Sequence, residues 1–204
     1  MFFVFLCLAT FTHADATLEA WLERQSSIRS IEVAFQQTRV LPSLKNPVIT
    51  TGKLTFARPD RIRWELGDPP VSIAVSDGKQ LTLIDRRKRT ARRLDVDSPQ
   101  AAHFSLLARD GFRSPAAFRG NFRMIASRTV SGVKQYTLQP LDTKLRAQVP
   151  WVFIDIDPAS LELRAFEVQL KDKSRIRSVF GKPRINGNLP DRAFEPPLDG
   201  ITVR

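Results

Sequence analysis

Short runs of alternating apolar and polar residues fill the segment from Gly52 to Asp85. Each run has the length of one β-strand, and the pairs Arg58-Pro59 and Asp77-Gly78 separate the runs with residues that favour turns. Because successive side chains of a strand point to opposite faces, each run has one polar face and one apolar face. The segment therefore predicts a sheet that wraps around something hydrophobic.

The same alternation continues on both sides of this segment. Further strands are expected around residues 31–35 and over 122–130, 133–139, 151–157, 161–170 and 175–181. The apolar positions of the first five strands are Ile31, Val33 and Phe35, Leu54 and Phe56, Ile62 and Trp64, Val71, Ile73 and Val75, and Leu81 and Leu83. About ten regularly spaced strands favour either a two-sheet sandwich or one strongly curved sheet.

Two or three short helices accompany the strands. Asp15 or Thr17 can cap a first helix, whose apolar face holds Leu18, Trp21, Leu22 and Ile28. Residues 100–108 have a similar pattern, and Ser114-Pro115 is a typical start for a third helix. A curved sheet covered by these helices accounts for both patterns. The residues expected to line its interior include Phe56, Trp64, Phe153, Phe166 and Val168, and the sequence leaves open whether that interior is packed core or ligand cavity.

Residues 1–14 form an uncharged leader with an apolar run from Phe2 to Ala9 and small residues at its end. This pattern predicts a signal peptide over 1–14 and one exported domain over 15–204. The mature chain then has no cysteine and one histidine, His103. Disulfides, a thiol nucleophile and a Cys/His metal site are therefore excluded, and no cofactor or metal is expected.

The sequence gives little evidence of a catalytic site. Asp155 and Asp157 lie two residues apart on one predicted strand, an arrangement open to a hydrolytic carboxylate pair, but a solvent-facing strand that ends at Pro158 explains them better. His103 and Ser105 lack the surroundings of a triad, and a glycine-rich phosphate loop is missing. We expect a binding protein and not an enzyme.

Positive charge is the second prominent feature, with a formal net charge of +11. Six of the eight residues from 86 to 93 are basic, namely Arg86, Arg87, Lys88, Arg89, Arg92 and Arg93. The run is either a solvated hairpin tip or a docking surface for anionic lipid or an acidic protein. Nucleic acid is a weaker alternative and is not expected, because the run has no interleaved aromatic residues for stacking on bases.

Several motifs together resemble the periplasmic carriers of outer-membrane lipoproteins, the LolA-like proteins. They are Phe35-x-Gln37, the block Gly52-x-Leu54-x-Phe56-x-Arg58-Pro59 followed by Trp64-Glu65, and Val75-Ser76-Asp77-Gly78-Lys79. The later segments Leu107-Ala108-Arg109 and Phe194 to Ile201 are similar to the second helix and the C-terminal strand of that family.

This resemblance implies a mainly β fold of the α+β class. Its sheet is an incomplete, strongly curved antiparallel β-barrel, with short helices forming a lid over a hydrophobic cavity that accepts the acyl chains of lipoproteins. It also implies a monomer in the periplasm that collects its cargo from an inner-membrane ABC-type release complex and passes it to an outer-membrane receptor. Alternatives are a LolA-like paralogue that carries another lipid and a periplasmic sensor or binding module for lipoproteins.

The resemblance also assigns roles to individual residues. Arg58 matches the arginine that holds the lid closed by hydrogen bonds to backbone carbonyls of the lid helices, a task that suits the five fixed donors of a guanidinium. Leu107, Ala108 and Trp21 are then lid contacts. The expected lipid cavity comprises Phe35, Phe56, Ile62, Trp64, Phe153, Phe166 and Val168.

Overall fold

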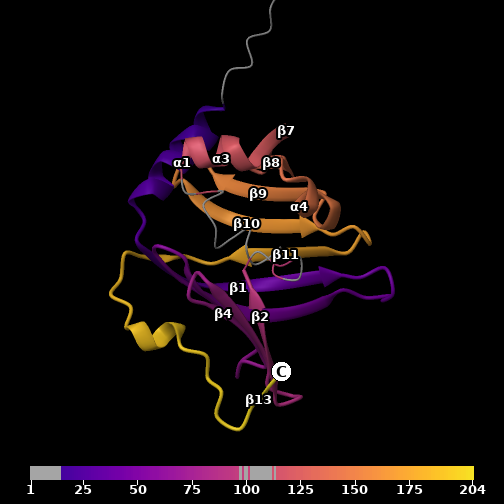
Figure 1. Cartoon of the computed structure of the whole chain (residues 1–204). Helices are drawn as coiled ribbons and strands as arrows, with labels where there is room; N and C mark the ends of the chain where they lie inside the picture. Colours follow the sequence, from indigo (N-terminus) through magenta and orange to yellow (C-terminus); the bar gives the residue numbers. More distant parts are fainter. Residues whose placement is uncertain (1–14, 97, 99–100, 102–111, 113) are drawn as a thin grey trace, which may run out of the picture.

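Strands are the main secondary structure of the computed structural model, which describes residues 15–96, 98, 101, 112 and 114–204 (Figure 1). The strands are β1 (Ser30–Val40), β2 (Val48–Ala57), β3 (Arg61–Leu66), β4 (Ser72–Ser76), β5 (Gln80–Asp85), β6 (Thr90–Asp95), β7 (Phe122–Val130), β8 (Val133–Pro140), β9 (Trp151–Asp157), β10 (Glu162–Gln169), β11 (Arg175–Phe180), β12 (Arg184–Ile185) and β13 (Thr202–Val203). The helices are α1 (Ala16–Ser27), α3 (Pro115–Asn121) and α4 (Thr143–Gln148), with a short 3-10 helix η3 (Asp191–Phe194).

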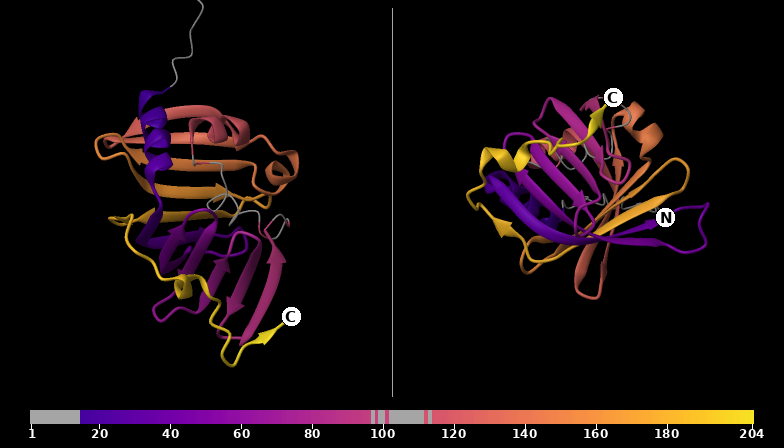
Figure 2. Two further views of the ribbon diagram at one scale, coloured as in Figure 1. Left: turned by 60° about the vertical axis from the view of Figure 1, so that its left-hand side comes forward. Right: turned by 90° about the horizontal axis from the view of Figure 1, so that it is seen from below.

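The strands form one sheet in the order β13-β6-β5-β4-β3-β2-β1-β11-β10-β9-β8-β7, and β12 also pairs with β1. Neighbours are antiparallel, except that β13 runs parallel to β6. Within the described residues the order starts at β13 and ends at β7 without joining them, so the sheet curls without closing (Figure 2). This confirms the mainly β, incomplete barrel that the resemblance to the lipoprotein carriers implies.

The main hydrophobic core lies on the concave face of the sheet. It joins residues of α1 and α3 to inward-facing residues of the strands, among them Leu22, Phe118, Tyr136, Ile154 and Phe180. Side chains of α1 and α3 thus complete a core that the curved sheet leaves open on one side. Of the helices in the part of the chain that is described, none is long and apolar enough to cross a membrane.

A second, smaller core lies on the opposite face of β4 and its neighbours. Ile73 and Val75 pack there with Phe194 of the C-terminal segment, whereas Ala74 between them belongs to the main core. The strand β4 is therefore buried on both faces. Alternation indicates that Ile73 and Val75 share one apolar face, but it does not show that a distant segment covers that face.

Candidate binding pocket beneath the first helix

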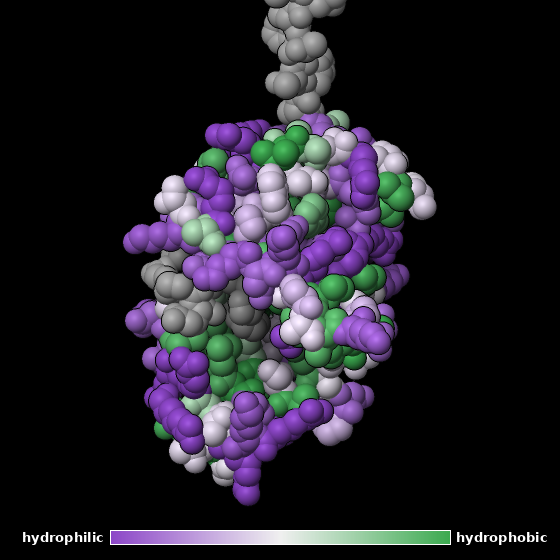
Figure 3. Space-filling view, turned by 90° about the vertical axis from the view of Figure 1, so that its right-hand side faces the viewer, coloured by the Kyte–Doolittle hydropathy of each residue, from purple (hydrophilic) through white to green (hydrophobic). Residues whose placement is uncertain are grey.

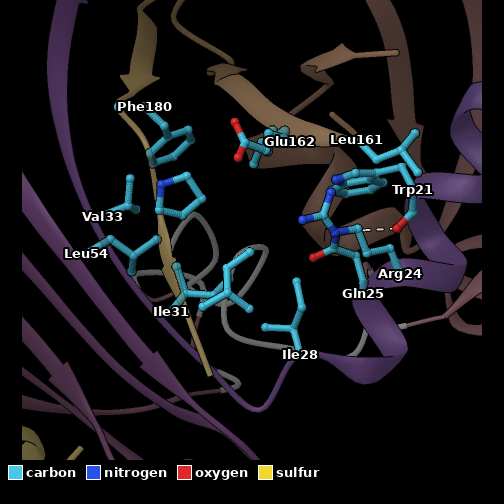
Figure 4. Close-up of a pocket in the computed structure, with 14 residues that line it drawn as sticks. Trp21, Arg24, Gln25, Ile28, Ile31, Val33, Leu54, Leu161, Glu162 and Phe180 are labelled. Atoms are coloured by element: carbon cyan, nitrogen blue, oxygen red, sulfur yellow. Dashed lines mark hydrogen bonds between the residues drawn. The ribbon is translucent and has the colours of Figure 1, made fainter. Parts of the chain in front are cut away.

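An apolar pocket lies beneath the C-terminal half of α1 (Figure 4). The residues that line it are Trp21, Arg24, Gln25 and Ile28 from the helix and its end, Ile31, Val33 and Leu54 from β1 and β2, and Leu161, Glu162, Leu163, Phe180, Gly181, Pro183 and Ile185 from the other side. Its volume is about 80 Å³. Pockets that enclose organic ligands usually measure about 300–1,000 Å³. In this conformation the pocket is therefore closed, and a long chain does not fit in it.

Arg58 holds the end of α1 over this pocket. It follows β2 directly, and its Nε donates a hydrogen bond of 2.6 Å to the carbonyl oxygen of Ile28, while Nη2 donates one of 2.9 Å to the carbonyl of Gln25. The last carbonyls of a helix lack partners within it and carry partial negative charge, so a guanidinium both satisfies and stabilises them. The predicted bonds to backbone carbonyls are present, and the role of Arg58 as a latch stays a prediction.

Asn186 supports the same end of the helix from the loop after β12. Its Oδ1 accepts a hydrogen bond of 2.6 Å from the backbone N–H of Arg29, and its Nδ2 donates to the carbonyl of Ser27 at 3.3 Å. The side chain of Arg24 also donates to the carbonyl of Ser160. These contacts were not predicted, since residues more than 130 positions apart leave no local pattern in the sequence.

Asp15 fixes the other end of α1. Its Oδ1 accepts hydrogen bonds from the backbone N–H groups of Thr17 (3.0 Å) and Leu18 (3.4 Å) and from the hydroxyl of Tyr136 (2.7 Å), while Lys134 Nζ lies 3.0 Å from Oδ2. Burial by itself raises the pKa of Asp15, but the hydrogen bonds from Tyr136 and Lys134 outweigh it and hold that pKa below its usual value. The cap was predicted, and its partners on β8 were not.

Residues 26–197 match the family described as outer membrane lipoprotein carrier protein LolA. The chain belongs to this family. An outer-membrane lipoprotein carrier protein of Pseudomonas putida KT2440 is 32% identical over 171 residues, which cover 82% of this chain and 77% of that protein. The LolA resemblance in the sequence motifs is thus confirmed.

Two solved structures share the fold of this LolA-family chain. One is an uncharacterized conserved protein from Thermus thermophilus, with a TM-score of 0.52, 10% identity and coverage of 92% of this chain and 97% of that one. The other is a putative outer membrane lipoprotein-sorting protein domain from Vibrio parahaemolyticus, with a TM-score of 0.50, 8% identity and coverage of 87% and 94%. At such low identity these likenesses support the fold alone.

Replacing Asp15 by alanine is expected to lower the free energy of unfolding by about 1–2 kcal/mol at pH 7, because the helix loses its cap and Tyr136 loses its acceptor. The folded carboxyl has a lower pKa than the unfolded one, so its contribution is complete above the ordinary pKa near 3.8 and is lost as the pH falls through the folded pKa. Urea unfolding of both proteins at pH 7 and pH 2.5 measures this. If the variant is destabilised relative to the wild-type protein by as much at pH 2.5 as at pH 7, the prediction is contradicted.

The predicted cavity residues of this LolA-family protein mostly lie in the main core. Phe35, Ile62, Trp64, Phe166 and Val168 are buried there, and the ring of Phe35 lies 4.2 Å from that of Trp64. The closed pocket has other lining residues, so contact of this cluster with lipid stays a prediction.

Three predicted positions need separate mention. Phe56 on β2 is only half-buried, and Trp21 is buried on α1, lines the pocket and places its ring 5.9 Å from that of Phe112. Leu107 and Ala108 lie outside the described residues.

The placement of Phe153 inside the barrel is wrong. On β9, Val152 and Ile154 point into the core, so Phe153 between them lies on the outer face, opposite Glu167 of β10. The strand begins with four apolar residues, so its pattern does not show which of them face inward. Sequence alternation identified the strand but not its inner face.

Asp155 lies on the same outer face but is only 5% exposed. The expectation that it faces solvent is therefore wrong. Arg177 forms ion pairs with Asp155 and with Glu167 of the neighbouring strand, and Arg175 also pairs with Glu167. Asp157 is held by Arg164 at 2.7 Å, and hydrogen bonds from Arg164 and from the N–H of Ser160 lower the pKa of Asp157 to about 2. Both aspartates of the predicted pair are thus engaged by arginines.

The six residues of the basic run are all exposed. Residues 86–89 form the turn between β5 and β6, and Arg92 and Arg93 follow on β6, whereas Ala91 is buried in the second core. The C-terminal β13 pairs with β6 beside this turn, with the N–H of Thr202 donating to the carbonyl of Arg89 at 2.9 Å. The position at a hairpin tip is confirmed for residues 86–89, whereas Arg92 and Arg93 lie on the strand, and the role of the run in docking stays a prediction.

Proposed function

We propose that this LolA-family protein is a periplasmic carrier that shields the acyl chains of lipoproteins in transit. It receives them from an inner-membrane ABC-type release complex and passes them to an outer-membrane receptor, without catalysing a reaction. The observation that carries the proposal is the apolar pocket whose covering helix is held by Arg58. A closed apolar pocket with a separable latch suits a protein that must take up a lipid and later give it away.

The energies of opening and loading are of similar size. Lifting the end of α1 breaks the two hydrogen bonds of Arg58, each worth about 1.5–3 kcal/mol because the donor is charged, and it also breaks the contacts of Asn186 and Arg24, which add to the energy of opening. Each methylene buried contributes about 0.8 kcal/mol. Roughly four to eight buried methylenes therefore offset the two Arg58 bonds, and a longer chain offsets the remaining contacts and favours the loaded state. When a receptor takes the chain, the same bonds re-form and favour closure.

Native mass spectrometry of the protein purified from a periplasmic extract tests this function. We expect a fraction of the protein to carry a bound acylated molecule, and the same protein after delipidation to lack it. A bound lipid other than a lipoprotein would indicate the paralogue alternative. A protein that leaves the extract without lipid, and that takes up no acylated peptide when one is added, would contradict the proposal.

The basic run is expected to act in docking and to contribute little to folding. Replacing Arg86, Arg87, Arg89 and Arg92 by glutamate should leave the melting temperature within about 2 °C, because exposed charges contribute little stability. The same changes should weaken binding to the release complex or to anionic vesicles. Salt should imitate them, since the Debye length is about 10 Å at 0.1 M. Unchanged binding of the variant in low salt would show that the run is only solvated.

A further inference from the structure

The β1–β2 hairpin extends beyond its neighbours in the sheet. Val40 is the last residue of β1 that pairs with β11, and Gly52 is the last residue of β2 that pairs with β3, so the residues between them have no strand beside them in these registers. Figure 1 shows this hairpin reaching out at the right of the molecule, and the right-hand view of Figure 2 shows it again. We call residues 39–49 the hairpin tip.

The hairpin tip exposes an unusual number of large apolar side chains. Val40, Leu44, Val48 and Ile49 are 45%, 48%, 40% and 62% exposed. They are four of the ten large hydrophobic residues that are exposed in the described part of the chain, although the tip is a small part of it. Apolar side chains gathered on a projecting element favour an interaction site over an ordinary surface.

The charge around the hairpin tip has one sign. Arg39 and Lys45 lie within it, and residues 38–52 contain no aspartate or glutamate. The turn between β10 and β11 lies beside the tip, because Val40 pairs with Arg175, and it adds exposed Lys171 and Lys173 against a single acid, Asp172. Figure 3 looks onto this side of the molecule and shows hydrophobic surface among hydrophilic side chains.

We propose that the hairpin tip docks the protein on an anionic lipid surface by inserting its apolar side chains between the headgroups. Its basic residues then contact lipid phosphates, and each basic residue close to the surface increases the affinity about fivefold. A lipid surface fits better than a protein pocket because the apolar residues lie on several sides of a narrow projecting turn and not on one flat face. Insertion stays shallow, about 5–10 Å, where water still satisfies the turn's backbone groups.

A fluorescent label tests insertion directly. Residues 15–204 contain no cysteine, so Ser43→Cys in this mature chain gives a single site in the tip for an environment-sensitive dye. We expect blue-shifted, stronger emission with phosphatidylglycerol-containing vesicles, quenching by brominated acyl chains, and little change with phosphatidylcholine alone. Ser131→Cys is the matched control. Ser131 lies in the turn before β8, a strand about 24 Å long, and α4 lies at the other end of that strand. The end of α4 contacts the β10–β11 turn through Lys171, so Ser131 is far from the side of the molecule that holds the hairpin tip. That label should not respond.

Paired substitutions test which side chains insert. Leu44→Gln with Ile49→Gln should weaken vesicle binding at least tenfold, and Arg39→Gln with Lys45→Gln should do the same and reduce its salt dependence. Met124→Gln with Ile125→Gln, two exposed apolar residues on β7, should leave binding unchanged. The proposal does not rest on the carrier function, so uptake of a fatty-acid probe should be normal in all three variants.

Three results would overturn this proposal. One is a label at residue 43 that does not respond to anionic vesicles, and another is an equal response to neutral ones. The third is a label that responds to a purified receptor or release complex but not to lipid, which would assign the hairpin tip to a protein partner. Failure of the fatty-acid probe to bind any of these proteins would instead contradict the carrier function.

Discussion

Arg58→Leu is expected to accept acyl cargo but to pass it to a receptor at least tenfold more slowly than the wild-type protein. The variant loses both hydrogen bonds to the end of α1, together worth about 3–6 kcal/mol, which moves the balance between closed and open forms far toward the open, loaded one. Reclosure then no longer helps to expel the lipid. Arg58 is not among the residues that line the pocket, so the substitution leaves the lining intact and loading itself should be preserved.

The measurement is transfer of a labelled lipoprotein from loaded carrier to acceptor. Arg58→Lys should be partly active, because lysine keeps the charge but loses the planar pair of donors. Arg128→Leu, at an exposed site on β7, controls for the loss of one arginine. A leucine variant at position 58 that transfers cargo at the wild-type rate would show that Arg58 is not the latch.

Ile31→Glu is expected to weaken binding of an environment-sensitive fatty-acid probe about 100-fold, whereas the wild-type protein should bind about one probe per chain. Ile31 lines the pocket on β1, and a carboxylate there has to be desolvated beside the incoming chain, at a cost of roughly 3 kcal/mol. The residue is only partly buried, so the protein should still fold.

Ala34→Glu is the matched control for this prediction. Ala34 lies three residues further along the same strand, on the outer face, and is exposed. Ile31→Trp adds bulk without charge and should also weaken binding, because it fills a pocket of about 80 Å³. If the probe binds both Ile31 variants as tightly as it binds the Ala34 control, the acyl chain enters elsewhere in the barrel.

Local patterns account for what the sequence predicts well. The strand expected over residues 122–130 is β7 with the same bounds, and Ser114 caps α3 as its Ser-Pro start indicates. Alternation, turn residues and caps act between residues close together in the chain, so they can be read from the sequence directly. The bonds of Arg58 came from the family resemblance, because an arginine before a proline does not by itself show what it contacts.

Contacts between distant segments account for what the sequence analysis missed. Asp15 meets Tyr136 across 121 positions, and Asn186 meets Ser27 across 159. In neither pair does a local sequence pattern around one residue indicate the other. The same reason explains Phe153, since which face of β9 is inner depends on how the whole sheet curls. A buried polar ladder such as Asp155 with Arg177 looks like an ordinary solvent-facing strand in the sequence.

The two ends of α1 are attached to different parts of the curled sheet, and this makes the helix work as a strut. Asp15 joins one end to β8, and Arg58 joins the other to the start of the β2–β3 turn, which lies on the other side of β1 and β11 in the strand order. A helix of 12 residues is about 18 Å long and does not stretch. While both joints hold, it fixes the spacing between the two halves of the barrel. If the contacts of Arg58, Asn186 and Arg24 at the far end were released together, the attachment at Asp15 would leave the helix free to pivot, and we expect the barrel to widen at the end where the pocket lies.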